Sequence, residues 1–467
     1  MSNHQFSHNA VVVPKVRTKF RQINTPIPVP ESLPTLHDLA RYESRSMHGQ
    51  LPVVWDRAED FQVWDRFGNC WIDFTSTIFV ANAGHANPLV KKAIQQQLDN
   101  GLFHSYTFAT EIRAQYLKKL VEFTPAQFQK AFLLSAGTEA TECAVKLMRL
   151  HGQVVGKRQG GIISFEESMH GRTMGAQMLG GTPASRAWIG YADPNIHRLP
   201  VPYPWTLQRE DGNRISGRER FHQDIDGLRS RGVNFKKDIC GFIIESYIGW
   251  GAVFYPKDYM QALDEFAKEN RILVAFDDIQ GGFGRTGRLF AYQHYEVEPD
   301  LICCGKGITS SLPLSAVLGR ASIMDLPDVG SMSSTHSANP LSCAAGLANI
   351  EAIESLNLIS ESRRKGEILF SKLDEVQMRF PERIAYVLGK GLLGALIVHD
   401  PASGRPDSDL ATKVCERAMQ KGLLLVHTGR ESIKIGPPLT IPDAALLEGI
   451  GVLAESIEEV AVSRGAN

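Results

Sequence analysis

The sequence predicts an α/β fold with a second, smaller α+β domain. Two apolar runs, residues 272–276 and 301–304, are typical of buried strands. The first ends in Asp277, Asp278 and a glycine-rich turn, and the second is followed by Lys306 between two glycines. Ligand sites in open α/β sheets lie at such carboxyl ends of strands. The last third of the chain alternates helical and strand patterns, which indicates the smaller α+β domain.

A chain of 467 residues is long enough for more than one domain. We expect residues 1–80 to form an N-terminal arm and part of the small domain. Residues 81–340 are expected to form the large, ligand-binding domain, and residues 341–467 the C-terminal small domain. The first 34 residues are polar and punctuated by prolines, which predicts an extended arm, either mobile or laid across a partner subunit.

Hydrophobic periodicity predicts the elements in order. Alternating apolar residues flank a turn at Gly68 and Asn69, so a hairpin is expected over residues 61–74. The expected helices cover residues 89–98, 111–123, 259–270 and 341–356, and a further helical stretch follows from residues 135–140 through residue 150. Further strands are expected at 131–134, 161–165, 238–245 and 314–319. Residues 180–235 have weak periodicity and predict a loop-rich region. The C-terminal elements are expected at 359–379, 391–399, 410–421, 423–427, 432–435 and 443–463.

Charge and composition exclude several classes of protein. Lys plus Arg total 50 and Asp plus Glu total 51, which argues against a general affinity for nucleic acid or anionic membrane. We find no apolar run long enough to span a membrane and no basic-then-apolar signal segment, so we expect a cytoplasmic protein. The seven cysteines include no Cys-x-x-Cys pair. They are expected to be reduced, small apolar residues, and we expect no metal site.

Lys306 and Asp277 form a pair whose chemistry suits pyridoxal 5′-phosphate (PLP). A lysine amine can hold the PLP aldehyde as a Schiff base, and a carboxylate can keep the pyridine nitrogen protonated so that the ring accepts electrons. Taken alone, a lysine is usually a solvated surface residue, and a strand-end aspartate is usually a turn residue. The motifs around them decide between these interpretations.

Residues 277–287, Asp-Asp-Ile-Gln-Gly-Gly-Phe-Gly-Arg-Thr-Gly, resemble the signature of class III aminotransferases, the ornithine, GABA and ω-amino acid group. That signature usually runs Asp-Glu-Val-Gln-x-Gly-Phe-Gly-Arg-Thr-Gly. The resemblance extends roughly over residues 61–439, where several separated motifs recur in order. It implies fold type I: a large domain with a mostly parallel seven-stranded sheet, plus a smaller α+β domain. It also implies PLP as cofactor, Lys306 as the Schiff-base lysine, Asp277 at the ring nitrogen and Gln280 at the ring hydroxyl oxygen.

Two further motifs are similar to cofactor-binding motifs of the family. Residues 135–140, Ser-Ala-Gly-Thr-Glu-Ala, join a strand to a helix, and the free N–H groups at such a helix start attract an anion. The resemblance implies that Gly137 and Thr138 hold the PLP phosphate; the plain alternative is a Thr-capped helix. In residues 168–173, Ser-Met-His-Gly-Arg-Thr, Met169 stands where the family places an aromatic ring against the pyridine.

Residues 333–340, Ser-Ser-Thr-His-Ser-Ala-Asn-Pro, are similar to the family's Thr-x-x-x-Asn-Pro. The resemblance implies that Thr335 reaches the phosphate of the cofactor in the neighbouring subunit. It therefore implies a homodimer with shared active sites.

Four residues are candidates for substrate binding. The resemblance places Ile78 at a substrate-contacting position and Glu245 where the family's acid pairs with a C-terminal arginine. Arg172 is the best candidate to bind a substrate carboxylate, because a guanidinium matches a carboxylate bidentately. The family's carboxylate-binding arginine is replaced by Lys434, a point charge without that geometry. Arg430 lies nearby in sequence and is a candidate to compensate.

The resemblance implies a PLP-dependent transaminase that uses a Lys306 Schiff base. It would move an amino group between a primary amine, of the ω-amino acid, diamine or amino sugar type, and a 2-oxo acid. The alternatives are a PLP-dependent amino acid racemase or epimerase, or a decarboxylase, on the same scaffold. A binding protein with a degenerate site is disfavoured because Lys306, Asp277 and Gln280 are all present.

Overall fold

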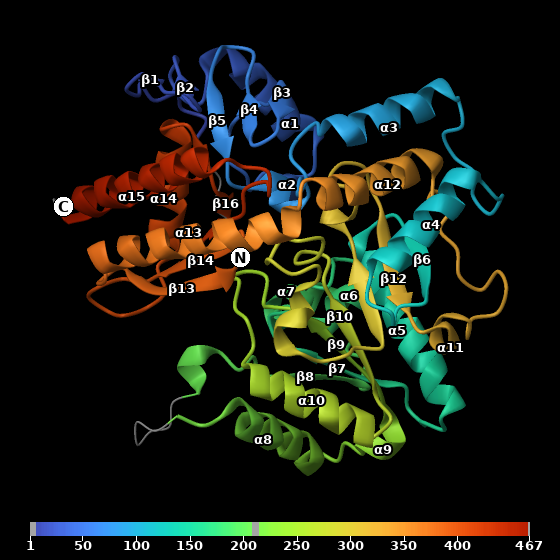
Figure 1. The fold of residues 1–467 in the computed structure, drawn as a ribbon. Helices are drawn as coiled ribbons and strands as arrows, with labels where there is room; N and C mark the ends of the chain where they lie inside the picture. Colours follow the sequence, from blue (N-terminus) through green and yellow to red (C-terminus); the bar gives the residue numbers. More distant parts are fainter. Residues whose placement is uncertain (1–5, 208–213, 466–467) are drawn as a thin grey trace.

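The computed structural model describes residues 6–207 and 214–465, with side chains described up to residue 462. Figure 1 shows a large domain, coloured from cyan through green to yellow, and a smaller part in which the blue N-terminal and red C-terminal segments lie together. This arrangement agrees with the predicted α/β fold with a second, smaller domain.

A seven-stranded sheet forms the centre of the large domain, in the order β6-β12-β11-β10-β9-β7-β8. Its strands are β6 (Lys130–Leu134), β7 (Gly161–Phe165), β8 (Ile196–Leu199), β9 (Ile239–Glu245), β10 (Leu273–Asp277), β11 (Leu301–Cys304) and β12 (Ser315–Gly319). Strand β12 runs antiparallel to both its neighbours, whereas the other pairs are parallel. The mostly parallel, seven-stranded sheet is therefore confirmed. All residues of β9, β10 and β11 are buried, as expected for strands covered on both faces.

Helices pack against this sheet and against one another. The long ones are α3 (Pro88–Asp99), α4 (Glu111–Phe123), α5 (Gly137–Val154), α8 (Gly217–Ser230), α10 (Lys257–Glu269) and α12 (Pro340–Ser355). The short ones are α6 (Met174–Leu179), α7 (Pro183–Arg186), α9 (Phe235–Asp238) and α11 (Ala321–Met324). The segment α2 (Ser76–Phe79) has positive φ angles and is a left-handed turn. Helix α5 lies against β9, β11 and β12, while α12 packs on α3 and α4. Short 3-10 turns occur at Pro30–Ser32, Arg45–Met47, Ala187–Ile189, Pro204–Thr206, Ala291–Tyr295 and Lys306–Ile308.

The prediction of a loop-rich region over residues 180–235 was wrong at strand β8, Ile196–Leu199, and in its last third, where α8 forms. Its core face consists of Phe221, Ile225 and Leu228, spaced at helical intervals and buried. Ser216 caps its start by accepting a hydrogen bond from the Glu219 N–H at 3.1 Å. The many Arg, Glu and Asp residues on its outer face concealed this short apolar stripe. Residues 208–213 of that region lie outside the described residues.

The C-terminal part is an α+β unit, as predicted. Its antiparallel sheet has the order β13-β14-β17-β16, formed by β13 (Ile384–Lys390), β14 (Leu393–Val398), β17 (Ser432–Ile435) and β16 (Val426–His427). The helices are α13 (Leu358–Arg379), α14 (Ser408–Gln420) and α15 (Asp443–Gly465). The single strand expected over residues 423–427 was wrong. It divides into β16 and β15 (Leu423–Leu424), which pair in two different sheets.

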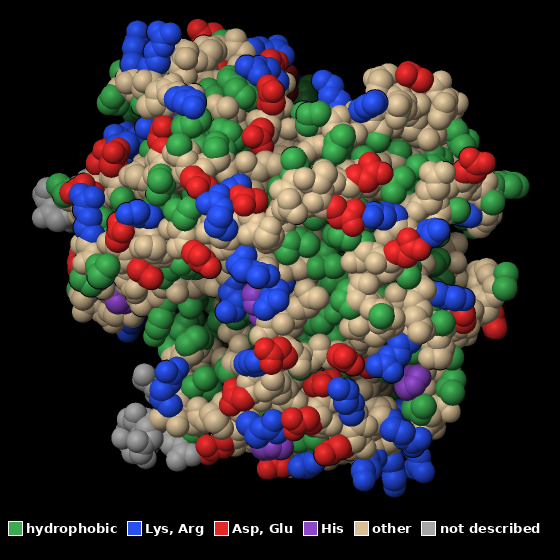
Figure 2. All heavy atoms as spheres, in the orientation of Figure 1, with side chains coloured by type: hydrophobic (Ala, Val, Ile, Leu, Met, Phe, Trp, Pro, Cys, Tyr) green, Lys and Arg blue, Asp and Glu red, His purple; other side chains and the backbone are tan. Residues whose placement is uncertain are grey.

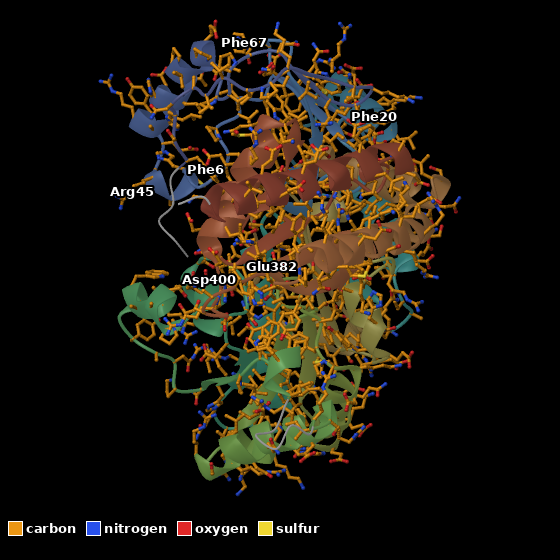
Figure 3. The ribbon with its side chains drawn as sticks, turned by 90° about the vertical axis from the view of Figure 1, so that its left-hand side faces the viewer. Phe6, Phe20, Arg45, Phe67, Glu382 and Asp400 are labelled. Atoms are coloured by element: carbon orange, nitrogen blue, oxygen red, sulfur yellow. The ribbon has the colours of Figure 1, made fainter. Side chains whose placement is uncertain are left out.

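The N-terminal segments join this C-terminal part. Strands β1 (Val16–Arg17), β2 (Gln22–Ile23), β5 (Cys70–Asp73), β4 (Gln62–Trp64) and β3 (Arg57–Glu59) form a sheet, and β15 pairs with β5. Helix α1 spans Leu33–Tyr42. Figure 3 shows Phe6 and Phe20 beside the red C-terminal helices, whereas Phe67 lies farther out, at the top of the view.

Part of the N-terminal arm expected over residues 1–34 packs on the small domain of the same chain. Ile23 and Ile27 are buried in a cluster with Trp71, Met419 and Leu424 of the same chain. The hydrophobic residues between the prolines therefore bind this stretch to its own small domain. Residues 1–5 lie outside the described part of the chain.

Arg285 connects the large domain to the C-terminal part. Its side chain is fully buried and donates hydrogen bonds to the carbonyls of Leu392, at 3.1 Å, and Pro437, at 2.5 Å. It also donates to Asn82 Oδ1, at 2.7 Å, and to Ser76 Oγ, at 3.3 Å. These four acceptors come from three separate stretches of chain, so one guanidinium fixes their relative positions.

The face in Figure 2 carries Lys, Arg, Asp and Glu side chains interspersed with hydrophobic ones. Such mixing does not create a broad field of one sign. Among the described helices, none combines the length and apolar character needed to cross a bilayer.

Candidate active site

The site lies at the carboxyl ends of three adjacent parallel strands. Glu245 is paired in register with Asp277, and Asp277 with Cys303, so the ends of β9, β10 and β11 are level. Lys306 follows three residues beyond Cys303. A cavity of about 1000 Å³ opens above them. The predicted residues that line it are Ile78, Gly137, Thr138, Met169, Arg172, Glu245, Asp277, Gln280, Lys306 and Lys434.

Lys306 stands at the start of the 3-10 turn Lys306–Ile308, with φ of +47°. A non-glycine residue with positive φ is uncommon, and this backbone strain is held by the buried strand before it and the turn after it. Burial lowers the pKa of Lys306, against the opposing charges of Asp277 and Glu245. A lysine shifted in this direction has a larger fraction of uncharged, nucleophilic amine near neutral pH.

Asp277 is fixed by two hydrogen bonds. Its Oδ2 lies 2.8 Å from Nδ1 of the buried His170, and its Oδ1 accepts the N–H of Ile279 at 3.2 Å. On the far side of the ring, His170 Nε2 lies 3.3 Å from Ser164 Oγ. The role of His170 as a support for Asp277 was not predicted. The sequence places His170 within the motif of residues 168–173, but no sequence pattern connects that motif to residue 277.

The start of α5 has the properties of an anion site. The Glu139 carboxylate accepts the N–H groups of Ser135 and Ala136, at 2.8 and 2.9 Å. Gly137 and Thr138 are the first residues of the helix, where N–H groups have no partner in an earlier turn. They line the cavity, so the positive end of the α5 dipole faces it.

Glu245 and Met169 are held together at the cavity wall. The Met169 N–H donates to Glu245 Oε2 at 2.9 Å. Burial raises the pKa of Glu245 to about 7, with the His170 charge opposing this shift and the Asp277 carboxylate adding to it. Within the described chain, Glu245 forms no ion pair with Lys434, the residue that stands in place of the family's arginine. Arg172 lies at the cavity with its side chain exposed.

Ile78 belongs to a left-handed turn. Ser76, Thr77, Ile78 and Phe79 have φ values of +45°, +51°, +62° and +67°. This conformation costs L-residues about 1–2 kcal/mol each, so the surrounding structure has to maintain it. Arg285 and the Gly436 carbonyl both hydrogen-bond to Ser76 Oγ and thereby anchor the turn.

Lys434 lines the cavity, but its amine is already hydrogen-bonded to Gln280 and to the backbone. Its amine donates to the Gly249 carbonyl at 2.5 Å and to Gln280 Oε1 at 3.0 Å. Its residue is 3% exposed. Burial, followed by the nearby Lys306 charge, lowers the pKa of Lys434 to about 7. Because Gln280 uses its oxygen to accept from Lys434 and from Tyr247 OH, at 3.3 Å, its NH2 group is oriented elsewhere.

Thr335 is the one predicted site residue that does not line this cavity in the described structure. It lies on an exposed turn before α12. Its neighbour Ser334 donates to Glu139 Oε1 at 3.4 Å, so this turn lies near the start of α5.

Comparison with known proteins identifies the family. Residues 43–457 match the family described as Aminotransferase class-III. The chain belongs to the class III aminotransferases. It is 34% identical over 423 residues to the 5-aminovalerate aminotransferase DavT of Pseudomonas aeruginosa, covering 88% of this chain and 95% of that protein. It is 32% identical over 422 residues to the 4-aminobutyrate aminotransferase GabT of Escherichia coli, again covering 88% and 95%.

Solved structures of aminotransferases have the same fold. The ornithine aminotransferase of Toxoplasma gondii superposes with a TM-score of 0.80 at 25% identity, covering 94% of this chain and 97% of that one. That structure has partial occupancy of PLP at the protein active site. The acetylornithine aminotransferase of Elizabethkingia anophelis superposes with a TM-score of 0.75 at 27% identity, covering 92% and 99%. This class III aminotransferase therefore has the fold type I architecture and is PLP-dependent.

The residues of the cavity fit PLP. An anion site at the start of α5, an amine at Lys306 and a carboxylate at Asp277 line the same cavity. These are the three groups that a phosphate, an aldehyde and a pyridine nitrogen require. The His170–Asp277 hydrogen bond fixes the carboxylate before the cofactor binds.

Proposed function

We propose that this aminotransferase moves an amino group from the terminal amine of an ω-amino acid to a 2-oxo acid, with Lys306 as the catalytic amine. The observation that carries the proposal is the placement of Lys306 and Asp277 at adjacent strand ends on one cavity. Relatives named for 4-aminobutyrate and 5-aminovalerate support the choice of donor class.

Each residue has a role that follows from its contacts. When bound, PLP supplies an aldehyde for covalent attachment and a ring that accepts electrons. Lys306 would hold that aldehyde through its amine and would carry the proton as general acid and base. Asp277, oriented by His170, would keep the ring nitrogen protonated. The Gln280 amide, oriented by Lys434, would be the donor for the ring oxygen.

The remaining predicted residues shape the binding of phosphate and substrate. Gly137 and Thr138 would hold the phosphate at the start of α5. Met169 would be the residue for the ring face, where a thioether gives a smaller gain than an aromatic ring. The other predicted substrate contacts, which form the walls of the cavity, are Ile78, Arg172, Glu245 and Lys434.

We further propose a cytoplasmic homodimer in which Thr335 completes the partner's phosphate site. The exposed position of Thr335 outside its own cavity supports this arrangement. Sedimentation of the holoenzyme tests the dimer. Mixing inactive Lys306→Ala and impaired Thr335→Ala subunits tests the shared site. A hybrid has one site that carries both defects and one intact site, so mixing should restore part of the activity.

Two measurements test the reaction itself. Borohydride reduction of the PLP-loaded protein should attach the cofactor at Lys306, detected by peptide mass spectrometry, and Lys306→Ala should lose the visible absorbance. The second measurement is product analysis with 4-aminobutyrate, 5-aminovalerate, ornithine and alanine, each with pyruvate or 2-oxoglutarate. Amino transfer from the terminal amines supports the proposal. Loss of α-chirality without net transfer would instead identify a racemase.

A further inference from the structure

Lys434 extends from the small domain to the cavity of the large domain. It lies on β17, the strand between β14 and β16, where it is paired with Ala395 and Val426. Its amine donates to the Gly249 carbonyl, at 2.5 Å, and to Gln280 Oε1, at 3.0 Å. Both acceptors belong to the large domain, so the small domain supplies a side chain to the wall of the cavity.

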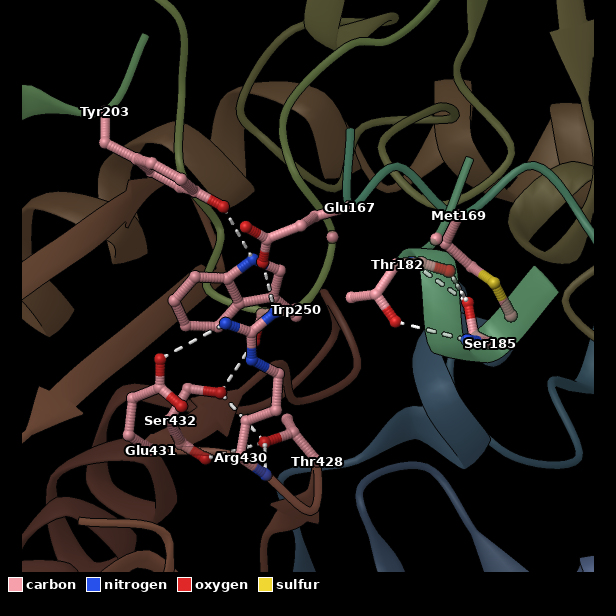
Figure 4. A network of polar contacts seen from close by, with 12 residues as sticks. Glu167, Met169, Thr182, Ser185, Tyr203, Trp250, Thr428, Arg430, Glu431 and Ser432 are labelled. Carbon is pink, nitrogen blue, oxygen red and sulfur yellow. Dashed lines mark hydrogen bonds and ion pairs between the residues drawn. The ribbon is translucent and has the colours of Figure 1, made fainter. Parts of the chain in front are cut away.

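Two further contacts cross the boundary between the domains. Ser432 lies two residues before Lys434, on the same face of β17, and its Oγ donates to the Trp250 carbonyl at 2.7 Å. Arg430, on the loop before β17, donates to Glu167 Oε2 at 2.5 Å. Figure 4 shows Ser432, Trp250, Arg430 and Glu167 grouped together. The Lys434 side chain therefore starts from a strand whose position against the large domain is fixed.

The surroundings of the Lys434 amine suit an ammonium group. An ammonium has three N–H donors, and two of them are used by Gly249 and Gln280. The nitrogen also lies 4.5 Å from the centre of the Phe79 ring, a distance at which the ring face attracts a cation. The residue is 3% exposed. A buried amine with these partners keeps one position, because it would lose them in any other.

The Gln280 amide is held in one orientation by two donors. Its Oε1 accepts from the Lys434 amine and from the Tyr247 OH, at 3.3 Å. The Tyr247 ring is stacked on Phe254, with ring centres 5.1 Å apart, so the hydroxyl is held as well. An amide turned by half a rotation would place its NH2 group against the Lys434 ammonium, which cannot accept a hydrogen bond. Gln280 lines the cavity, so its NH2 group is the part that remains for a ligand there.

We propose that Lys434 is a positioning residue through which the small domain completes the cofactor site. Its amine holds the Gln280 oxygen away from the cavity and leaves the NH2 group for the ring oxygen of PLP. This inference rests on the proposed function, in which Gln280 serves that oxygen. It adds that the cofactor site depends on a residue of β17, although the other residues proposed to hold PLP within one chain belong to the large domain.

The charge of Lys434 should also act on the nitrogen that Lys306 uses to hold PLP. The charged groups that act on Lys434 are Lys306, Glu245 and Arg285. A nearby cation disfavours a further proton on the Lys306 nitrogen, and an N–H donor stabilises the ring oxygen without its proton. Both effects lower the pH at which the bound cofactor loses a proton and its visible absorbance changes.

The test measures two properties of the full chain with PLP: the dissociation constant of PLP and the pH at which the visible absorbance changes. Lys434→Met should weaken PLP binding about tenfold and raise that pH by about one unit. Gln280→Met should weaken PLP binding to a similar extent. In the double variant the two losses of affinity should not add, because Lys434 acts through Gln280. Lys434→Gln, which keeps a polar side chain without the charge, should raise the pH of the absorbance change as well.

Lys157→Met is the matched control. The Lys157 amine is also buried and donates to the carbonyls of Phe235, at 3.0 Å, and Asn270, at 2.8 Å, but the residue lies outside those that line the cavity. This variant should leave both properties unchanged. An absorbance change at the wild-type pH in both Lys434 variants, or losses of affinity that add in the double variant, would show a structural brace and overturn the proposal. Neither measurement uses an amine substrate, so a wild type that shows these effects but transfers no amino group would contradict the proposed reaction alone.

Discussion

Arg285 should determine whether the left-handed turn beside the cavity persists. We consider Arg285→Met, which keeps an unbranched apolar stem but removes the guanidinium. The change leaves the carbonyls of Leu392 and Pro437 and the Asn82 Oδ1 atom without this donor. These atoms lie in a fully buried region, so water cannot readily replace the lost hydrogen bonds.

The expected cost follows from the two shortest hydrogen bonds, at 2.5 and 2.7 Å. A buried acceptor that loses its donor costs about 1–3 kcal/mol, so the pair contributes about 4 kcal/mol. Removing a buried charge recovers part of its desolvation cost, which reduces the expected loss to about 3 kcal/mol. Arg285→Lys, which keeps the charge and one donor group, should lose less.

Hydrogen exchange with mass spectrometry provides the assay. The amides of Phe79, Gly436 and Leu439 donate to Thr75, Phe74 and Asn82 carbonyls, so they report on this junction. In Arg285→Met, peptides that cover residues 74–82 and 434–440 should exchange about a hundredfold faster, while those of β10 change little. The control is Arg288→Met, at an exposed position three residues further on. Less than about threefold acceleration at the junction would refute the reasoning.

Three further predictions concern buried groups near the cavity. Burial, then the Lys306 charge, lowers the pKa of Lys434 to about 7 from 10.5, so the unfolded chain binds more protons between these values. The free energy of unfolding of the wild type, relative to that of Lys434→Met, should therefore increase as pH rises between these two values, by up to about 1.4 kcal/mol per pH unit. Urea unfolding at several pH values measures it. Burial raises the pKa of Asp278 to about 7 from 3.8, while the N–H of Tyr292 opposes the shift. The free energy of unfolding of the wild type should therefore fall as pH rises through that range. Asp278→Asn should have the same stability as the wild type below the range and a higher stability above pH 7. Equal pH profiles of the two proteins would contradict this reasoning. In Gly436→Ala the new Cβ would overlap the Phe79 ring, so the turn should move and kcat/KM should fall, whereas the control Gly451→Ala adds a Cβ in open space.

The sequence by itself determined most of the central sheet and the strand-end residues Asp277 and Lys306. Strand β10 and strand β11 are apolar runs that end in distinctive residues, Asp277 and Lys306. A strand that is buried on both faces of a parallel sheet needs an uninterrupted apolar run. Such a run consists of a few consecutive residues, so it is visible in the sequence alone. Local patterns were therefore sufficient to place both side chains at one edge of the sheet.

Only the tertiary structure decided which polar groups meet around that pair. The Glu167–Arg430 and Lys434–Gln280 contacts join residues far apart in sequence. Each of these side chains is able to form hydrogen bonds with many other polar groups. The left-handed turn around Ile78 opposes the local preference of its residues and depends on the buried Arg285 for its anchor. Hydrophobic periodicity indicates which face of a helix or strand packs against the core. These polar contacts depend on distances that are fixed only after the domains have packed.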